Sequence, residues 1–257
     1  LSVNLTKREG GYGAVKVLLN GKEINQDARG ANFDPDQDKQ TLKIDIKDHP
    51  YLKEGENKIT VIAASENGIN SRGVDNIIQI KKKEQKEPQF FAVVVGIGEY
   101  ANDNINLKFP VADAKAISKA VSLGAQNLFK DRSHVYTLTS NSDKRPTKDN
   151  LKAVFQDIAN KSSSEDIILL YLAGHGISTS GDQGDFYFLT ADAMSANQEA
   201  YRDEQIRKKT TISTNEWVAW LKEIPALKQV MILDACGSGK AVDNLIAERD
   251  IEPSQRK

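Results

Sequence analysis

Beyond residue 90, strand-length runs rich in apolar residues alternate with segments that have helical spacing. The runs are FFAVVVGI (90–97), VYTLTS (135–140), DIILLYLAG (166–174) and QVMILDA (229–235). Such runs are typical of strands buried on both faces of a sheet. The segments DAKAISKAV (113–121), TKDNLKAVFQDIANK (147–161) and TNEWVAWLKEI (214–224) predict helices, the first with Ala114, Ile117 and Val121 on one face. The alternation predicts an α/β domain with a mostly parallel sheet and helices on both faces.

The first 80 residues have a different pattern, with short strands separated by turn signals. AVKVLLNGKEI (14–24) contains the hairpin signal Asn20-Gly21, and TLKIDI (41–46) alternates apolar and polar residues. EGENKITVIAAS (54–65) and DNIIQI (75–80) add further strands. This pattern predicts a small all-β sandwich of immunoglobulin-like type over residues 1–80. The charged segment KKKEQKEP (81–88) predicts an exposed linker over 81–89, so that the α/β domain spans 90–257.

Composition excludes several classes of protein. The chain has 257 residues, a formal net charge of −1 and a pI of about 6.4, which gives no indication of a nucleic-acid or membrane surface. No apolar run approaches the roughly 18 residues of a membrane span, and these 257 residues show no signal-peptide pattern. The single cysteine cannot form an internal disulfide and favours a reducing, cytoplasmic compartment.

The candidate chemistry lies at two strand ends. His175, in YLAGHGISTSG, and Cys236, in MILDACGSGK, each follow a predicted buried strand by one or two residues. Ligands of open α/β sheets bind outside the carboxyl ends of the strands, so two neighbouring strands would bring both side chains to one crevice. Taken singly, a structural histidine and a small buried cysteine are the simpler interpretations. Glycines around both residues favour a reactive pair, because glycine backbone can approach a substrate closely and direct N–H groups at an oxyanion.

Three other motifs do not hold up as cofactor or metal sites. GIGEYA (96–101) fits the dinucleotide-binding spacing, but no predicted helix follows it directly. GSGK (237–240) ends like a phosphate-binding loop, although the rest of that pattern is absent. His49 and His134 have no acidic or sulfur neighbour at metal-ligand spacing. The sequence therefore predicts no cofactor and no metal site.

The blocks FFAVVVGIGEY…LKFPVADAKAISKAV, IILLYLAGHGIS and QVMILDACGSG resemble the core of the caspase-like cysteine peptidases. They are most similar to the bacterial metacaspase and orthocaspase branch, over roughly residues 90–250. The resemblance implies the caspase-haemoglobinase fold and a large-subunit region. It implies a catalytic pair of Cys236 and His175, with the backbone N–H groups of Gly176 and Cys236 as the oxyanion hole. Animal caspases have glutamine where this chain has Asp234.

That departure carries an expectation about substrate. In metacaspases, aspartates at the positions of Asp113 and Asp234 line the pocket for the P1 side chain. Two carboxylates fit a guanidinium or ammonium group, so the resemblance implies cleavage of proteins after Arg or Lys. Taken without the resemblance, Asp113 would be a helix-start carboxylate and Asp234 a turn-capping residue.

The resemblance also raises questions of activation and regulation. Family members have two further strands after the cysteine, so the resemblance implies a companion small-subunit chain and activating cleavage between the subunits. The basic pair Arg256-Lys257 fits the product of such a cut, and an arbitrary boundary is the alternative. A calcium requirement is left open, because the acids Asp182, Asp185, Asp203 and Glu204 are scattered among bases. The alternatives are an inactive caspase-like scaffold and a CHAT-type peptidase of an immune effector system.

Overall fold

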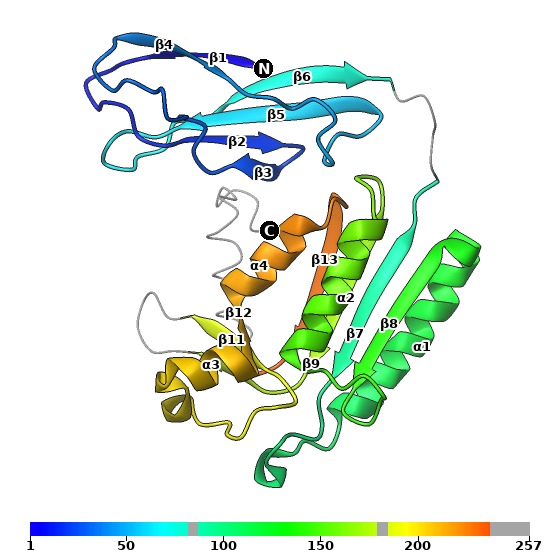
Figure 1. The fold of residues 1–257 in the computed structure, drawn as a ribbon. Helices are drawn as coiled ribbons and strands as arrows, with labels where there is room; N and C mark the ends of the chain where they lie inside the picture. Colours follow the sequence, from blue (N-terminus) through cyan, green and yellow to red (C-terminus); the bar gives the residue numbers. More distant parts are fainter. Residues whose placement is uncertain (82–86, 179–184, 237–257) are drawn as a thin grey trace. The chain divides into compact units, whose positions relative to one another are not determined.

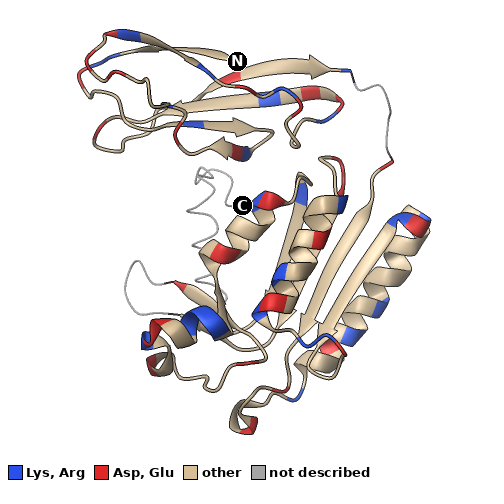
Figure 2. Ribbon diagram, in the orientation of Figure 1, with Lys and Arg blue, Asp and Glu red and all other residues tan. Residues whose placement is uncertain are grey.

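A computed structural model describes residues 1–81, 87–178 and 185–236 of the chain (Figure 1). Its contacts divide the chain into two compact units. The first, here the N-terminal unit, comprises Leu1–Glu87 with Ser163–Glu165, and the second, the C-terminal unit, comprises Pro88–Ser162 with Asp166–Lys257. Acidic and basic positions are interleaved along the described ribbon of both units (Figure 2).

The described part of the N-terminal unit is all β. Its strands are β1 (Ser2–Thr6), β2 (Val15–Leu19), β3 (Lys22–Asn25), β4 (Lys39–Lys43), β5 (Gly55–Ala63) and β6 (Val74–Ile80). β1 and β4 pair with each other, and the other four form an antiparallel sheet in the order β3-β2-β5-β6. Asn20 and Gly21 both have positive φ in the two-residue turn between β2 and β3, which confirms the predicted hairpin. β4 ends at Lys43, before the predicted Ile46, where Asp45 begins a turn by accepting a hydrogen bond from the Lys47 N–H.

A four-stranded parallel sheet forms the centre of the C-terminal unit. Its strands are β7 (Phe90–Gly96), β8 (Ser133–Thr139), β9 (Ile167–Ala173) and β13 (Lys228–Asp234). They are the four strands that the apolar runs predict, and they lie in the order β13-β9-β7-β8. The parallel α/β prediction is therefore confirmed.

Helices cover both faces of this sheet, as the alternating pattern predicts (Figure 1). The helices are α1 (Pro110–Phe129), α2 (Lys148–Lys161), α3 (Glu204–Thr210) and α4 (Thr214–Glu223), with short 3₁₀ turns at Asp103–Ile105, Lys130–Arg132 and Gln198–Arg202. α1 packs on one face through Ala114, Ile117 and Val121. α2 and α4 cover the other face, where Phe155 and Trp217 belong to the main core.

The sequence pattern missed a small antiparallel sheet beside the site. It consists of β10 (Gly176–Ser178), β11 (Phe186–Leu189) and β12 (Thr211–Ser213), in that order. Strands of three or four residues are too short to show an alternating pattern in sequence. β10 begins directly after His175, so this sheet fixes the course of the chain next to the histidine.

β13 is the edge strand of the described parallel sheet. Along it, exposed and half-buried residues alternate, and Val230 and Ile232 remain 52% and 45% exposed. β9, its neighbour, is buried along most of its length. Among the described helices, none combines the length and apolar character that a membrane crossing would require.

Candidate active site

His175 and Cys236 stand at equivalent positions on neighbouring strands. β9 and β13 pair in parallel, and Ala173 lies opposite Asp234 at the carboxyl end of that pairing. Each candidate residue follows two positions later, which puts His175 and Cys236 at the same level of the sheet edge. The condition set by the sequence, that the two strands be neighbours, is fulfilled.

The two backbones stay in contact beyond the strand ends. The N–H of Gly174 donates to the carbonyl oxygen of Asp234 at 3.2 Å. A Cβ on Gly176 would lie 2.5 Å from the carbonyl oxygen of Cys236 and 2.5 Å from the Phe186 ring. Contacts that short do not occur between real atoms, so position 176 requires glycine for space. The loop after β9 therefore lies directly against Cys236.

Three contacts orient His175, which is half-buried. Its Nε2 lies 2.8 Å from the carbonyl oxygen of Ile105, its backbone N–H donates to the Tyr100 hydroxyl at 2.8 Å, and its carbonyl accepts from the Leu189 N–H at 3.0 Å. A carbonyl oxygen can only accept, so Nε2 carries a proton, and in the neutral imidazole Nδ1 then holds the lone pair. The imidazole therefore has a basic nitrogen that is not used by the Ile105 contact.

Tyr100 is a site residue that sequence reasoning missed. Its side chain is 4% exposed, and its ring centroid lies 5.1 Å from that of His175. Burial raises the pKa of Tyr100 far above its usual value, so the phenol is neutral and can accept the His175 N–H. Tyr100 lies in the motif GIGEYA (96–101), which the sequence analysis compared only with the dinucleotide-binding spacing. Ile105 contributes through its backbone carbonyl and leaves no signal in a sequence.

Cys236 differs from His175 in being exposed. It directly follows Ala235, which is half-buried against the main core, and it is the last described residue of the chain. The thiol is thus accessible to solvent, in contrast to the buried hydrophobe of the simpler interpretation. The glycines Gly237 and Gly239 lie outside the described residues.

The two acidic residues assigned to the P1 pocket act on the same tyrosine. Asp234 ends β13, and Asp113 lies in the first turn of α1; both are exposed. Burial raises the pKa of Tyr171, and the negative charges of Asp234 and Asp113 raise it further. Both carboxylates therefore lie within electrostatic reach of one hydroxyl group on β9, on the face of the sheet that carries α1.

The acids considered for calcium have other roles where they are described. Asp203 caps α3 by accepting from the N–H groups of Gln205 and Ile206. Glu204 pairs with Lys208 at 2.6 Å, and this contact lowers the pKa of Glu204. Within the described ranges, no three His, Cys, Asp or Glu side chains are grouped to hold a metal ion. Asp182 lies outside those ranges, and the calcium question stays open.

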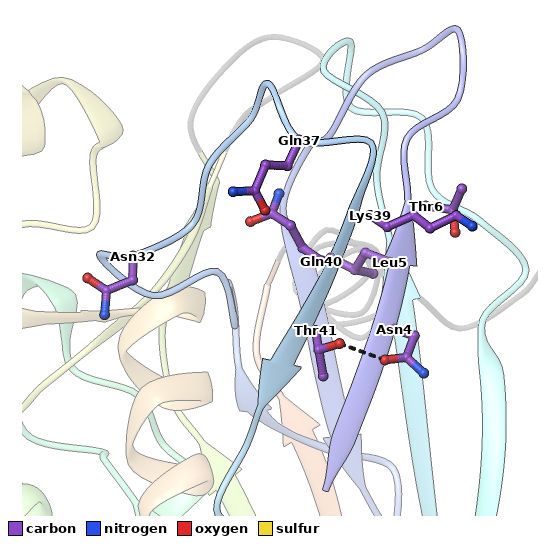
Figure 3. Close-up of a pocket in the computed structure, with 8 residues that line it drawn as sticks. All are labelled: Asn4, Leu5, Thr6, Asn32, Gln37, Lys39, Gln40 and Thr41. Carbon is purple, nitrogen blue, oxygen red and sulfur yellow. Dashed lines mark hydrogen bonds between the residues drawn. The ribbon is translucent and has the colours of Figure 1, made fainter.

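In the described part of the chain, two of the cavities have neither His175 nor Cys236 in their lining. One, of about 580 Å³, lies on the β1–β4 pair of the N-terminal unit (Figure 3). Amide and hydroxyl side chains dominate its lining, and Thr41 donates to Asn4 at 2.8 Å within it. The other, of about 320 Å³, lies at the carboxyl edge of the parallel sheet, between the start of α1 and the ends of β7 and β8.

The fold and the two strand ends define an α/β protein with a candidate cysteine–histidine site. The chain belongs to the caspase domain family of cysteine peptidases (Peptidase_C14), whose model matches residues 89–256. The resemblance seen in the sequence is confirmed at this level. No curated protein matches the chain.

Among solved structures, the chain is similar to a protein of Geobacter sulfurreducens. The identity is 18% and the TM-score 0.43, and the match covers 64% of this chain. The chain spans 56% of the length of that protein.

Proposed function

We propose that the chain is a cysteine endopeptidase in which Cys236 and His175 form the catalytic pair. The observation that carries this proposal is the common level of the two residues at the ends of paired strands. His175 Nδ1 takes the thiol proton, and the resulting thiolate attacks the scissile carbonyl carbon. The imidazolium then protonates the leaving amine, and water hydrolyses the thioester.

The oxyanion hole of this proposal consists of the N–H groups of Gly176 and Cys236. In an antiparallel ladder, hydrogen-bonded and non-bonded pairs alternate. Leu189 N–H donates to the His175 carbonyl, whereas the His175 N–H donates to Tyr100, so only one of the two bonds of a bonded pair is made here. By the register, Gly176, opposite Phe188, falls at the following non-bonded position. Its N–H then points away from β11. This orientation supports a role at the oxyanion, whose stabilisation is a large part of acyl-transfer catalysis.

Asp113 and Asp234 are proposed to select Arg or Lys at P1. Their joint effect on Tyr171 supports a common location, and together they supply two negative charges for one cation. Selectivity of this kind belongs to the metacaspase-like subtype, which is part of the proposal.

The exposed edge of β13 supports a further subunit. No described strand pairs with the outer side of β13, and Val230 and Ile232 leave apolar surface on one face of this same strand. An open apolar edge is an aggregation hazard unless it is covered. We infer a non-covalently held small subunit at this edge. Activating cleavage of the chain itself would fall among residues 237–257, outside the described residues.

The N-terminal unit is proposed to be an immunoglobulin-like module. Its two-sheet, all-β organisation supports this assignment, with Leu5, Tyr12, Val15 and Leu42 in a core of their own. A cytoplasmic location, inferred from the single cysteine, stays a prediction.

Fluorogenic peptides that differ only at P1 test the function. We expect cleavage after Arg and Lys, little after Asp or Leu, and none with Cys236→Ala. Asp234→Asn and Asp113→Asn should each lower kcat/KM on Arg peptides by about 10- to 100-fold, or about 1.4–2.8 kcal/mol, since each removes one charge facing the cation. Asp131→Asn, an exposed acid just beyond the far end of α1, is the matched control and should have no effect.

Two results would contradict the proposal. Equal rates for Asp234→Asn, Asp113→Asn and the wild type would remove the P1 assignment. A chain that cleaves no peptide, with a thiol alkylated no faster than free cysteine, would favour the inactive scaffold. Each measurement is made with and without calcium, which also tests the metal requirement.

A further inference from the structure

We propose that the cavity at the start of α1 is a subsite for an acidic side chain in the leaving-group half of the substrate. This inference rests on the proposed peptidase function and adds a second element of specificity to it. The cavity has a volume of about 320 Å³, and the charged and polar residues of its lining are Lys108, Lys115, Glu99 and Asn141. Pockets of about this size are large enough for ligand groups with their water.

The chemistry of the site gives the direction in which a substrate crosses the sheet edge. The acyl half of the substrate becomes bound to Cys236 at β13, while the leaving amine takes its proton from His175 at β9. The peptide therefore passes from β13 towards β9 as it runs from P1 to P1′. The same direction continues to β7 and then β8, because the strand order is β13-β9-β7-β8. The cavity lies on this path.

The spacing of the strands gives the substrate position. Neighbouring strands lie about 4.8 Å apart, so the end of β8 is roughly 10 Å beyond that of β9. An extended peptide covers about 3.3 Å per residue. The cavity is thus within reach of the side chains at P2′ to P4′.

The charge of the cavity favours a carboxylate. Lys108 and Lys115 supply two positive charges against the single negative charge of Glu99. Both lysines are exposed, and neither forms an ion pair or hydrogen bond with any described residue; the Lys108 ammonium lies only over the Phe109 ring, at 5.8 Å from its centroid. The two ammonium groups are therefore available to a ligand.

The start of α1 separates this positive cavity from the negative P1 region. Residues two positions apart on an α-helix point about 200° apart, so Asp113 and Lys115 lie on nearly opposite flanks of α1. Asp113 lies towards Tyr171 on β9, whereas Lys115 lines the cavity beside the end of β8. A substrate with a basic P1 residue and acids a few residues later would match both flanks.

The walls of the cavity are fixed by hydrogen bonds. The buried hydroxyl of Ser140 accepts from the N–H groups of Gly98 and Glu99, both at 2.9 Å. Leu107 N–H donates to the Gly98 carbonyl at 2.8 Å, and a Cβ on Gly98 would lie 2.9 Å from the Leu107 carbonyl oxygen. The loop between β7 and α1 therefore closes tightly on itself. A preformed subsite loses little free energy on ordering when it binds.

Two internally quenched peptides test the subsite in the full chain. Both have Arg at P1, and they carry either Glu or Gln at P2′ to P4′. We expect the Glu peptide to have about fivefold higher kcat/KM, since two partly exposed ion pairs contribute modestly. The preference should disappear in Lys108→Gln/Lys115→Gln and persist in Lys119→Gln, an exposed lysine on α1 outside the cavity. It should also decrease between about 0.05 M and about 0.5 M NaCl, as screening increases.

A binding measurement separates this inference from the proposed function. Fluorescence anisotropy of the same peptides with Cys236→Ala should give the same Glu preference, with the same dependence on the two lysines. Glu-selective binding without cleavage by the wild type would contradict the peptidase proposal and support the subsite. Equal binding of Glu and Gln peptides, or a preference that survives the double variant, would overturn the subsite.

Discussion

β9 and β13 are neighbours in one sheet and each leads to one residue of the candidate pair, yet they are held very differently. β9 lies between two strands and is buried along most of its length, whereas β13 lies at the edge with alternate residues exposed. His175 is oriented by Ile105, Tyr100 and Leu189. Cys236 is exposed at the end of the described chain. The histidine half of the site is thus held by contacts to the core, whereas the cysteine half follows an edge strand and is exposed.

Removing each reactive side chain should have the same effect on cleavage and different effects on folding. Cys236→Ala and His175→Ala should each lower kcat/KM by about 10³-fold or more. Cys236→Ala should change the free energy of unfolding by less than about 0.5 kcal/mol, because the thiol is exposed. His175→Ala should lower it by about 1–3 kcal/mol, because the Ile105 carbonyl loses its partner. Urea unfolding measures the difference; equal losses of stability would contradict the comparison.

Truncation of one aliphatic residue on each strand tests how the two strands are packed. Leu170 on β9 is fully buried, and Leu170→Ala should cost about 2–5 kcal/mol of unfolding free energy. Ile232 on β13 is 45% exposed, and Ile232→Ala should cost less than about 1 kcal/mol. If Ile232→Ala proved as costly as Leu170→Ala, β13 would be buried in solution by a partner or by the rest of the chain. Adding the proposed small subunit should raise the cost of Ile232→Ala towards that of Leu170→Ala.

Tyr100→Phe tests whether the histidine half is held by this hydroxyl. The change leaves the His175 N–H without its acceptor, so kcat/KM should fall about tenfold through misplacement of the imidazole. Tyr136→Phe is the matched control, because it removes a hydroxyl that bonds Asp157 at 2.7 Å, away from the site. The control should lose similar stability and keep its kcat/KM and the pH profile of kcat/KM. Equal activity in both variants would remove the positioning role of Tyr100.

The smallest expected effect is on the pH dependence of stability, through Tyr171 on β9 and Asp234 on β13. Its folded-state pKa is raised by burial and by Asp234 and Asp113, so the folded protein holds the phenol proton more tightly than the unfolded chain. This stabilisation is complete below about pH 10 and is lost as the pH rises through the raised pKa. Tyr171→Phe should therefore lose less stability than the wild type above about pH 10. Identical pH dependence of urea unfolding would show that the pKa of Tyr171 is not raised in the folded protein.

The sequence predicted the parts of the fold that rest on long periodic segments. All four strands of the parallel sheet and the helices α1, α2 and α4 follow from apolar runs and helical spacing, because burial on both faces leaves a clear pattern. The sequence places His175 and Cys236 at the ends of two strands. It does not say that these strands are neighbours, so their common position at the sheet edge could not be predicted. Asp113 and Asp234 came from the family resemblance. The contacts of Tyr100 and Ile105 depend on the course of a loop, and a backbone carbonyl has no signature among side chains.

The close contacts around Gly176 show that the fold itself requires glycine at this position, whether or not the protein is catalytically active. A methyl group there would overlap the backbone of Cys236 and the ring of Phe186, neither of which takes part in bond breaking. A homologue that lacks the cysteine would still need this glycine in order to fold. Glycine at this position in a related sequence therefore indicates the same local fold, and it does not by itself indicate peptidase activity.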